Sequence, residues 1–268
     1  MKDLRSRFGF HATPFTREIP IKDRFEFEPS CQAIDSLLQI VDQRESGVLI
    51  APAGTGKTLV LRALVSRLPE ARYRTHYVKV TNLSKRDMCR EISMAAGAEP
   101  AGSFPSLVRK LQERYLQILD TDGLRPVLIL DDCHEIRLDV LAIIRVLTNF
   151  EMDSRLVLSV ILCGQPPLRR LLQQEALEDV ARRMAHFASL RPLSRQETHE
   201  YVTHRCNVAG AKSLPFDQKA LDAIYEIGRG NLRATDRLAL KSLEVSHEHD
   251  NDVVDQTHTI EARKRLWP

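Results

Sequence analysis

A glycine-rich segment is the part of the sequence whose residue types most directly indicate chemistry. It consists of Ala51, Pro52, Ala53, Gly54, Thr55, Gly56, Lys57 and Thr58. Glycines at this spacing allow backbone N–H groups to converge on phosphate oxygens, and a helix that follows adds its positive end. Lys57 would neutralise the β- and γ-phosphates of a nucleotide, and Thr58 would offer its hydroxyl group to Mg²⁺. Ala51 stands where the strict phosphate-loop pattern has a glycine, and a simple glycine-rich turn is the alternative.

Two adjacent acids supply the other half of such a site. Asp131 and Asp132 directly follow the apolar run 127–130, and open α/β sheets build ligand sites at the carboxyl ends of strands. We expect Asp131 to hold Mg²⁺ through its water shell and Asp132 to act as the general base that polarises the attacking water. Glu, one methylene longer, is usual at the second position, so the shorter Asp132 predicts slow hydrolysis. Glu135 is interpreted as a helix-start acid rather than a second base.

The pattern of apolar residues predicts the elements that must position these side chains. Strands are expected at 47–51, 73–80, 127–130 and 156–163, and helices at 31–41, 59–68, 84–96, 103–119 and 138–150. The first strand leads into the glycine-rich segment and a helix leaves it, which is the context that a phosphate loop requires. Strands that alternate with helices predict an α/β fold in which helices sandwich a parallel sheet.

Three regions follow from this pattern. Residues 1–30 are expected to form an arm laid over a core, because 7–29 are rich in Phe and Pro and show no sustained helical period. Residues 31–191 form the predicted α/β domain. Residues 192–268 lack strand patterns and are expected to form a small all-helical domain with a short basic tail at 261–268. The helices predicted within it are 194–209, 217–227 and 232–246.

Composition and charge limit the function classes. A net charge of +3 and a pI near 8.6 permit contact with nucleic acid without indicating it. The five cysteines show no metal-ligand spacing and no disulfide framework, so a reducing, cytoplasmic environment is expected. The longest apolar stretch, 156–163, is shorter than the roughly 20 residues that cross a membrane, and the N-terminus has no signal-peptide core. We therefore expect no membrane association.

Taken together, these motifs resemble those of the AAA+ ATPases of the general-secretion A-type (ExeA-like) family and of their relatives among transposition helper ATPases (TnsC-, MuB- and IstB-type). The resemblance extends to the N-terminal segment Phe8-Gly-Phe10 with Pro14-Phe15, which in such proteins lies near the adenine and the neighbouring subunit. It implies a P-loop NTPase of the AAA+ type with a helical lid, ATP and Mg²⁺ as ligands, and a homo-oligomeric ring or helical filament.

Further positions are assigned through this resemblance. Gln165, in a Gly-Gln-Pro segment, resembles the γ-phosphate sensor, with a Gly-Pro turn as the alternative. Arg183, rather than Arg182, resembles the arginine finger that enters the neighbouring subunit's site, although adjacent arginines on an exposed helix are often only solvated. Arg233 resembles the lid arginine that touches the phosphates. Leu232 replaces the proline of the family's motif, so the direction of Arg233 is less fixed.

Several functions would use such a nucleotide site. The favoured one is a regulator of transposition that assembles with ATP on duplex DNA, recruits a transposase and has a target-selection adaptor as a further partner. Slow hydrolysis would then control disassembly. The alternatives are a secretion or envelope-assembly ATPase, whose relatives continue through a membrane helix, and a replication helicase loader. No membrane span and no appended DNA-reading module are found in the sequence, which favours the first.

Contact with DNA is expected to be to phosphates and independent of base sequence. The candidate donors are Lys79, Lys85, Arg86, Arg109 and Lys110. Such contacts release counterions, so binding should weaken steeply with salt. For each residue, a solvated helix face is the alternative.

Overall fold

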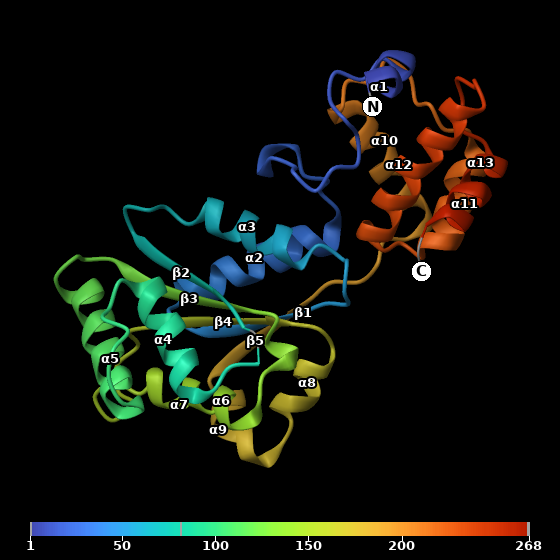
Figure 1. Cartoon of the computed structure of the whole chain (residues 1–268). Helices are drawn as coiled ribbons and strands as arrows, with labels where there is room; N and C mark the ends of the chain where they lie inside the picture. Colours follow the sequence, from blue (N-terminus) through green and yellow to red (C-terminus); the bar gives the residue numbers. More distant parts are fainter. Residues whose placement is uncertain (1, 81, 267–268) are drawn as a thin grey trace. The chain divides into compact units, whose positions relative to one another are not determined.

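A five-stranded parallel sheet, in the order β2-β3-β4-β1-β5, forms the centre of the α/β part of the computed structural model (Figure 1). The structure describes residues 2–80 and 82–266. The strands are β1 (Ser46–Ile50), β2 (Tyr73–Lys79), β3 (Arg125–Asp131), β4 (Ser159–Gly164) and β5 (Met184–Ser189). β3 and β4 are buried almost throughout, which explains their unbroken apolar sequences. The predicted parallel α/β sheet is confirmed.

The chain divides into two compact units that interleave along the sequence. The α/β unit contains Glu28–Pro52 and Lys57–Leu190. The helical unit contains Ala53–Gly56 together with the described parts of Met1–Phe27 and Arg191–Pro268. The phosphate-loop residues 53–56 therefore group with the helical unit, whereas the residues on either side of them belong to the α/β unit.

Helices lie on both faces of the sheet in the α/β unit. They are α2 (Glu28–Asp42), α3 (Lys57–Arg67), α4 (Lys85–Ala96), α5 (Phe104–Asp120), α6 (Leu138–Leu141), α7 (Ile143–Leu147), α8 (Pro167–Leu172) and α9 (Glu178–Arg182). Figure 1 shows α2 and α3 on one face and α6 to α9 toward the other.

Two sequence expectations for this unit were wrong in detail. The single helix expected at 138–150 is divided at Ala142 into α6 and α7, in a stretch whose β-branched residues lower helix propensity. β5 was not predicted, because three consecutive residues, Ala185 to Phe187, are exposed and break the apolar pattern. β5 lies at the edge of the sheet, where only one side is paired.

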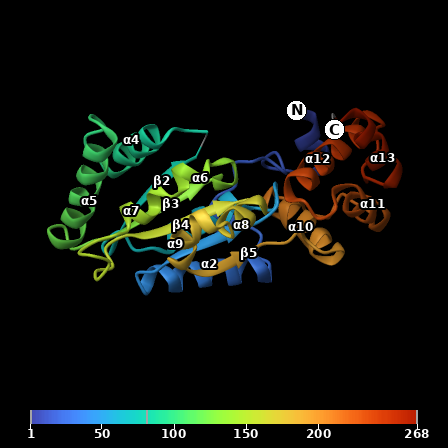
Figure 2. The same cartoon turned by 90° about the horizontal axis from the view of Figure 1, so that it is seen from below.

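The helical unit contains α1 (Lys2–Phe8), α10 (Arg195–Val208), α11 (Gln218–Gly228), α12 (Leu232–Glu248) and α13 (Gln256–Arg265). In Figure 2, α11, α12 and α13 lie together. Side chains of Ser194, Asp217, Asn231 and Asp255 cap the starts of α10 to α13. The basic tail expected at 261–268 is helical through Arg265, and its residues 267–268 lie outside the described part of the chain.

The N-terminal arm packs into the core of the helical unit. Leu4, Phe8, Phe10 and Phe15 are buried among apolar residues of α10 to α13.

No helix in residues 2–80 and 82–266 combines the length and apolar character that crossing a lipid bilayer requires.

Arg205 fastens this arm from inside the helical unit. Its guanidinium donates to the Thr16 carbonyl oxygen (2.6 Å) and to the Tyr201 hydroxyl (2.8 Å), and it pairs with Asp236 (3.2 Å). The Arg205 side chain is only 7% exposed, and it lies 5.8 Å from the centroid of the Phe15 ring. Burial raises the pKa of Asp236 to about 6, against the opposing charge of Arg205.

Candidate nucleotide-binding site

The phosphate loop joins the end of β1 to the start of α3. Ala51 continues from β1 and donates its backbone N–H to the Gly164 carbonyl oxygen of β4 (3.0 Å). Gly54 and Gly56 adopt φ angles of +75° and +97°. L side chains rarely adopt this region, so the loop depends on glycine at both positions. The strand, loop and helix follow one another as the sequence predicted.

Lys57 points its charge into the loop. Its ammonium group donates to the carbonyl oxygens of Ala51 and Pro52, both at 3.1 Å, and the residue is 9% exposed. An ammonium has three hydrogens, so one more donor remains for a phosphate oxygen. Thr58, the next residue, is exposed at the first turn of α3.

The start of α12 touches the phosphate loop within the helical unit. Asn231 Nδ2 donates to the Ala53 carbonyl oxygen (2.6 Å), while Asn231 Oδ1 accepts from the backbone of α12. A Cβ atom added to Gly54 would lie 2.4 Å from Asn231 Oδ1. Sequence reasoning assigned no role to Asn231. Its one signal was its helix-capping residue type directly before a predicted helix.

Arg233, which resembles the lid arginine, contributes its backbone to this contact. Its N–H donates to the Gly54 carbonyl oxygen (3.3 Å), and its side chain is exposed. The backbone of Arg233 therefore lies beside the loop.

The acid pair lies at the end of β3, and β2 supplies a partner to each acid. Asp131 is 3% exposed and accepts hydrogen bonds from the Tyr77 hydroxyl (3.0 Å) and the Asp132 backbone N–H (2.8 Å). Asp132 is in the left-handed region (φ +61°) and pairs with Lys79 at 3.4 Å. Tyr77 and Lys79 are two positions apart on β2 and so share a face. Sequence reasoning missed Tyr77 and assigned Lys79 to DNA.

Cys163 on β4 connects the two halves of the site. Burial raises the pKa of its thiol above the ordinary value, and the charge of Asp131 raises it further, while Lys57 acts in the opposite direction. Both charged groups therefore lie close to the same thiol. Burial and then the charge of Asp131 also raise the pKa of Tyr77. Within the α/β unit, Lys57 and Asp131 are thus the two charged residues that act on the Cys163 thiol.

Gln165 directly follows β4 and contacts His134, which follows the acid pair. Gln165 Nε2 lies within hydrogen-bond distance of His134 Nε2. Neighbouring parallel strands end at the same edge of a sheet, which brings these two residues together. His134 Nδ1 is buried without a hydrogen-bond partner in the described part of the chain. Glu135 has a 67% exposed side chain in the short turn after the acids. Sequence reasoning missed His134.

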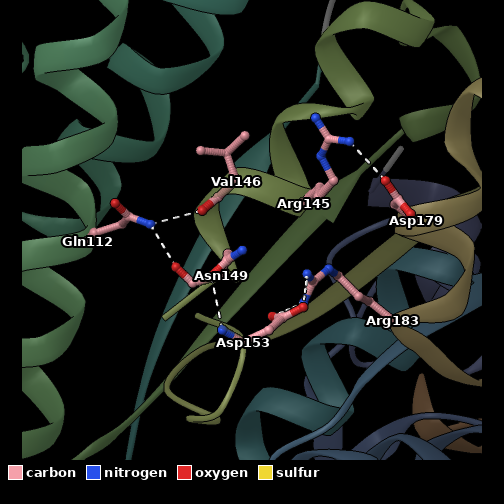
Figure 3. Close-up of a pocket in the computed structure, with 7 residues that line it drawn as sticks. All are labelled: Gln112, Arg145, Val146, Asn149, Asp153, Asp179 and Arg183. Carbon is pink, nitrogen blue, oxygen red and sulfur yellow. Dashed lines mark hydrogen bonds and ion pairs between the residues drawn. The ribbon is translucent and has the colours of Figure 1, made fainter. Parts of the chain in front are cut away.

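The two candidate finger arginines are both paired within the chain. Arg182 is 74% exposed and bonds to Glu178 one turn earlier on α9 (2.6 Å). Arg183 directs both terminal nitrogens to the two carboxylate oxygens of Asp153, with Nη1 to Oδ1 at 2.6 Å (Figure 3). Asp153 was not singled out from the sequence.

Four of the five DNA candidates have internal partners. These pairs are Lys79 with Asp132 (3.4 Å), Lys85 with Asp139 (3.8 Å), Arg86 with the Gly102 carbonyl oxygen (3.1 Å) and Lys110 with Glu99 (2.5 Å). Arg109 is exposed on α5, beside α4.

Comparisons with known proteins agree with this geometry. Residues 40–172 match the family model described as AAA domain. General secretion pathway protein A of Aeromonas hydrophila is 31% identical over 228 residues, which are 83% of this chain and 41% of that protein. The chain therefore spans less than half the length of this relative.

Solved structures show the same fold at low sequence identity. The Aeropyrum pernix ORC2 protein, solved as ADPNP-ADP complexes, aligns with a TM-score of 0.73 at 15% identity and covers 96% of this chain and 72% of its own. The Aeropyrum pernix ORC1 protein in complex with DNA aligns with a TM-score of 0.69 at 16% identity, over 96% and 69%. The sheet, the phosphate loop and these similarities identify the chain as a AAA+ P-loop protein related to general secretion pathway protein A.

Proposed function

We propose that the protein hydrolyses ATP with Mg²⁺ at the phosphate loop. The observation that carries the proposal is the placement of Lys57, whose ammonium group donates to the Ala51 and Pro52 carbonyl oxygens directly after a loop with two left-handed glycines. Thr58 and Asp131 fit Mg²⁺, which proteins bind through one or two carboxylates and substrate phosphates. In the described residues, no group of three or more His, Cys, Asp or Glu side chains forms a separate metal site.

Each residue around the γ-phosphate would have a separate role in hydrolysis. Asp132 is the proposed base. Its carboxylate pairs with Lys79 at 3.4 Å, so it is already engaged before a water molecule can bind to it. Release from Lys79 would precede water activation, which adds to the slow turnover expected of the short side chain. Gln165 would sense the γ-phosphate, Arg183 would reach a neighbouring subunit's nucleotide, and Arg233 would contact phosphates from α12.

Two substitutions test the ATPase proposal. Lys57→Ala should abolish nucleotide binding, and Asp132→Asn should keep binding while phosphate release falls by roughly 100-fold or more. Binding is measured with a fluorescent ATP analogue and hydrolysis by phosphate release. Hydrolysis by Asp132→Asn at the wild-type rate would refute Asp132 as the base.

We further propose that ATP licenses assembly of the protein as a homo-oligomer on duplex DNA. The support is the fold shared with an ORC1 protein in complex with DNA and the exposed Arg109. Binding should be independent of base sequence and should weaken steeply between low and high salt. Retention of labelled duplex on a filter, with and without ATP, measures it. No ATP-dependent retention at low ionic strength would end this proposal.

We propose that the oligomer on DNA binds a transposase and, in addition, a target-selection adaptor. The competing function is secretion or envelope assembly, which the similarity to general secretion pathway protein A favours. Electron micrographs in a slowly hydrolysed ATP analogue separate them. A ring or filament that requires duplex DNA supports the first function, whereas rings indifferent to DNA support the second.

A further inference from the structure

A polar hollow in the α/β unit contains two ion pairs of similar chemistry. The hollow measures about 570 Å³ and is lined by Gln112, Arg145, Val146, Asn149, Asp153, Asp179 and Arg183 (Figure 3). Arg145 bonds to one oxygen of Asp179 (2.8 Å), and these side chains are 56% and 60% exposed. Arg183 bonds to both oxygens of Asp153 and is only 22% exposed. The second pair is therefore the more constrained one.

Asp153 belongs to a turn with an unusual backbone. Glu151, Met152 and Asp153 have φ angles of +50°, +56° and +69°, a region that side chains other than glycine rarely adopt. Packing does not hold this turn, because Met152 is 96% exposed. Hydrogen bonds hold it instead, from the Asp153 backbone to Asn149 Oδ1 (3.1 Å) and from Ser154 to the Glu151 carbonyl oxygen (2.7 Å). Such turns persist where the surroundings impose them, often at switches.

The bonding of Arg183 leaves its guanidinium incompletely satisfied. Its two terminal nitrogens face Asp153, while Nε is buried without a hydrogen-bond partner in the described residues. A guanidinium has five N–H donors, and a phosphate offers more acceptor oxygens than one carboxylate. The Arg183 hydrogen bond lowers the pKa of Asp153, so this acid stays charged under ordinary conditions.

We propose that Asp153 is a latch that keeps Arg183 in its own subunit until a neighbouring subunit presents nucleotide phosphate. In this exchange, Arg183 leaves the carboxylate of Asp153 and pairs with a phosphate instead. No covalent bond forms or breaks. Partly exposed ion pairs are weak, so this exchange needs no large driving force. Asp153 is then a positioning residue that acts through Arg183. The inference rests on the proposed role of Arg183 at a shared ATP site.

Asp153→Asn tests the latch in the whole 268-residue chain. Asn tolerates left-handed backbone, so the turn is preserved while the charge is removed. We expect hydrolysis per subunit, at protein concentrations below full assembly, to rise roughly two- to fivefold, the effect of losing a partly exposed ion pair. Asp179→Asn is the matched control in the same hollow and should behave as wild type. A lowered melting temperature with unchanged hydrolysis would mean that the pair only stabilises the turn, and would overturn the latch.

Arg183→Ala separates the latch from the proposed function. If this variant hydrolyses ATP as wild type does, the finger role of Arg183 fails, and the latch fails with it. If Arg183→Ala is slow but Asp153→Asn matches wild type, only the latch fails.

Chemical labelling provides a readout that does not depend on hydrolysis. Phenylglyoxal modifies accessible arginines, and mass spectrometry reports the extent at each one. We expect Arg183 to be labelled several-fold faster in Asp153→Asn than in wild type, while Arg182 serves as the internal reference because it is already exposed. Equal labelling of Arg183 in both proteins would overturn the latch.

Discussion

The phosphate loop and the turn at Glu151–Asp153 both use left-handed backbone, but they are made from opposite residue types. The loop places Gly54 and Gly56 at φ +75° and +97°, where glycine has no steric cost. The turn places Glu, Met and Asp at φ +50° to +69°, where each residue costs about 1–2 kcal/mol. The backbone of the loop is thus unstrained, whereas the strained backbone of the turn is kept in place by its hydrogen bonds and by Arg183. A binding site benefits from the first arrangement and a switch from the second.

The largest expected effect comes from Gly54→Ala. This substitution gives the loop the same steric cost of a side chain at positive φ that the turn already has. Its Cβ would lie 2.4 Å from Asn231 Oδ1 at a φ of +75°. We expect nucleotide affinity to fall by about 100-fold or more, measured by titration with a fluorescent ATP analogue.

Gly97→Ala is the matched control for this substitution. Gly97 has a φ of +68° after α4, and no atom lies within 4 Å of its added Cβ. It should lower the free energy of unfolding by about 1 kcal/mol and leave nucleotide affinity unchanged. Similar losses of affinity in both variants would show that backbone strain at any glycine, rather than the loop contact, is responsible.

A smaller effect is expected from Asn231→Asp, which removes the donor that holds the loop. Asp keeps the cap on α12 but cannot donate to the Ala53 carbonyl oxygen, 2.6 Å away, and repels it. Amide hydrogen exchange of residues 53–56 without nucleotide should quicken roughly five- to tenfold. Asp217→Asn, a cap exchange at α11, should leave that exchange unchanged. An unaltered rate in Asn231→Asp would mean that the glycines alone hold the loop.

Met152→Gly should make the turn resemble the loop. Gly removes the left-handed cost but adds unfolded-state entropy, so we expect a net gain of about 0.5–1 kcal/mol in the free energy of unfolding. Urea denaturation measures it. Met94→Gly, at another exposed methionine inside α4, should instead destabilise by about 1 kcal/mol. A loss of stability in Met152→Gly would contradict the strain attributed to this turn.

The smallest effect concerns pH and the unit that holds the loop. The hydrogen bond from Arg191 lowers the pKa of Glu197 from 4.5 to about 2. A lowered pKa means that this stabilisation is complete above pH 4.5 and disappears as the pH falls toward 2. Glu197→Gln should lower the free energy of unfolding by about 0.5 kcal/mol at neutral pH, and its melting temperature should converge with that of wild type near pH 2. A constant difference across this range would exclude Glu197 as the titrating group.

Sequence patterns were sufficient where function follows from residue type and neighbouring positions. The phosphate loop, the strand that ends in Asp131 and the parallel sheet could be predicted because each is local and strongly patterned. β5 and the partition at Ala142 could not, because exposure on an edge strand and β-branched residues weaken the pattern. The pairing of Arg183 with Asp153 depends on a 30-residue separation that periodicity does not encode.

The fastening of the N-terminal arm by Arg205 also sets an order for synthesis. Thr16 and Arg205 are 189 residues apart, so the arm leaves the ribosome long before its partners exist. At a synthesis rate of about 5–20 residues per second, roughly 10–40 seconds pass between the synthesis of the arm and that of α10. Its phenylalanines remain exposed during this time. During that interval the α/β unit can complete its sheet, whereas the helical unit cannot close. Phe8, Phe10 and Phe15 therefore stay without their apolar partners until the helices of this unit have been synthesised.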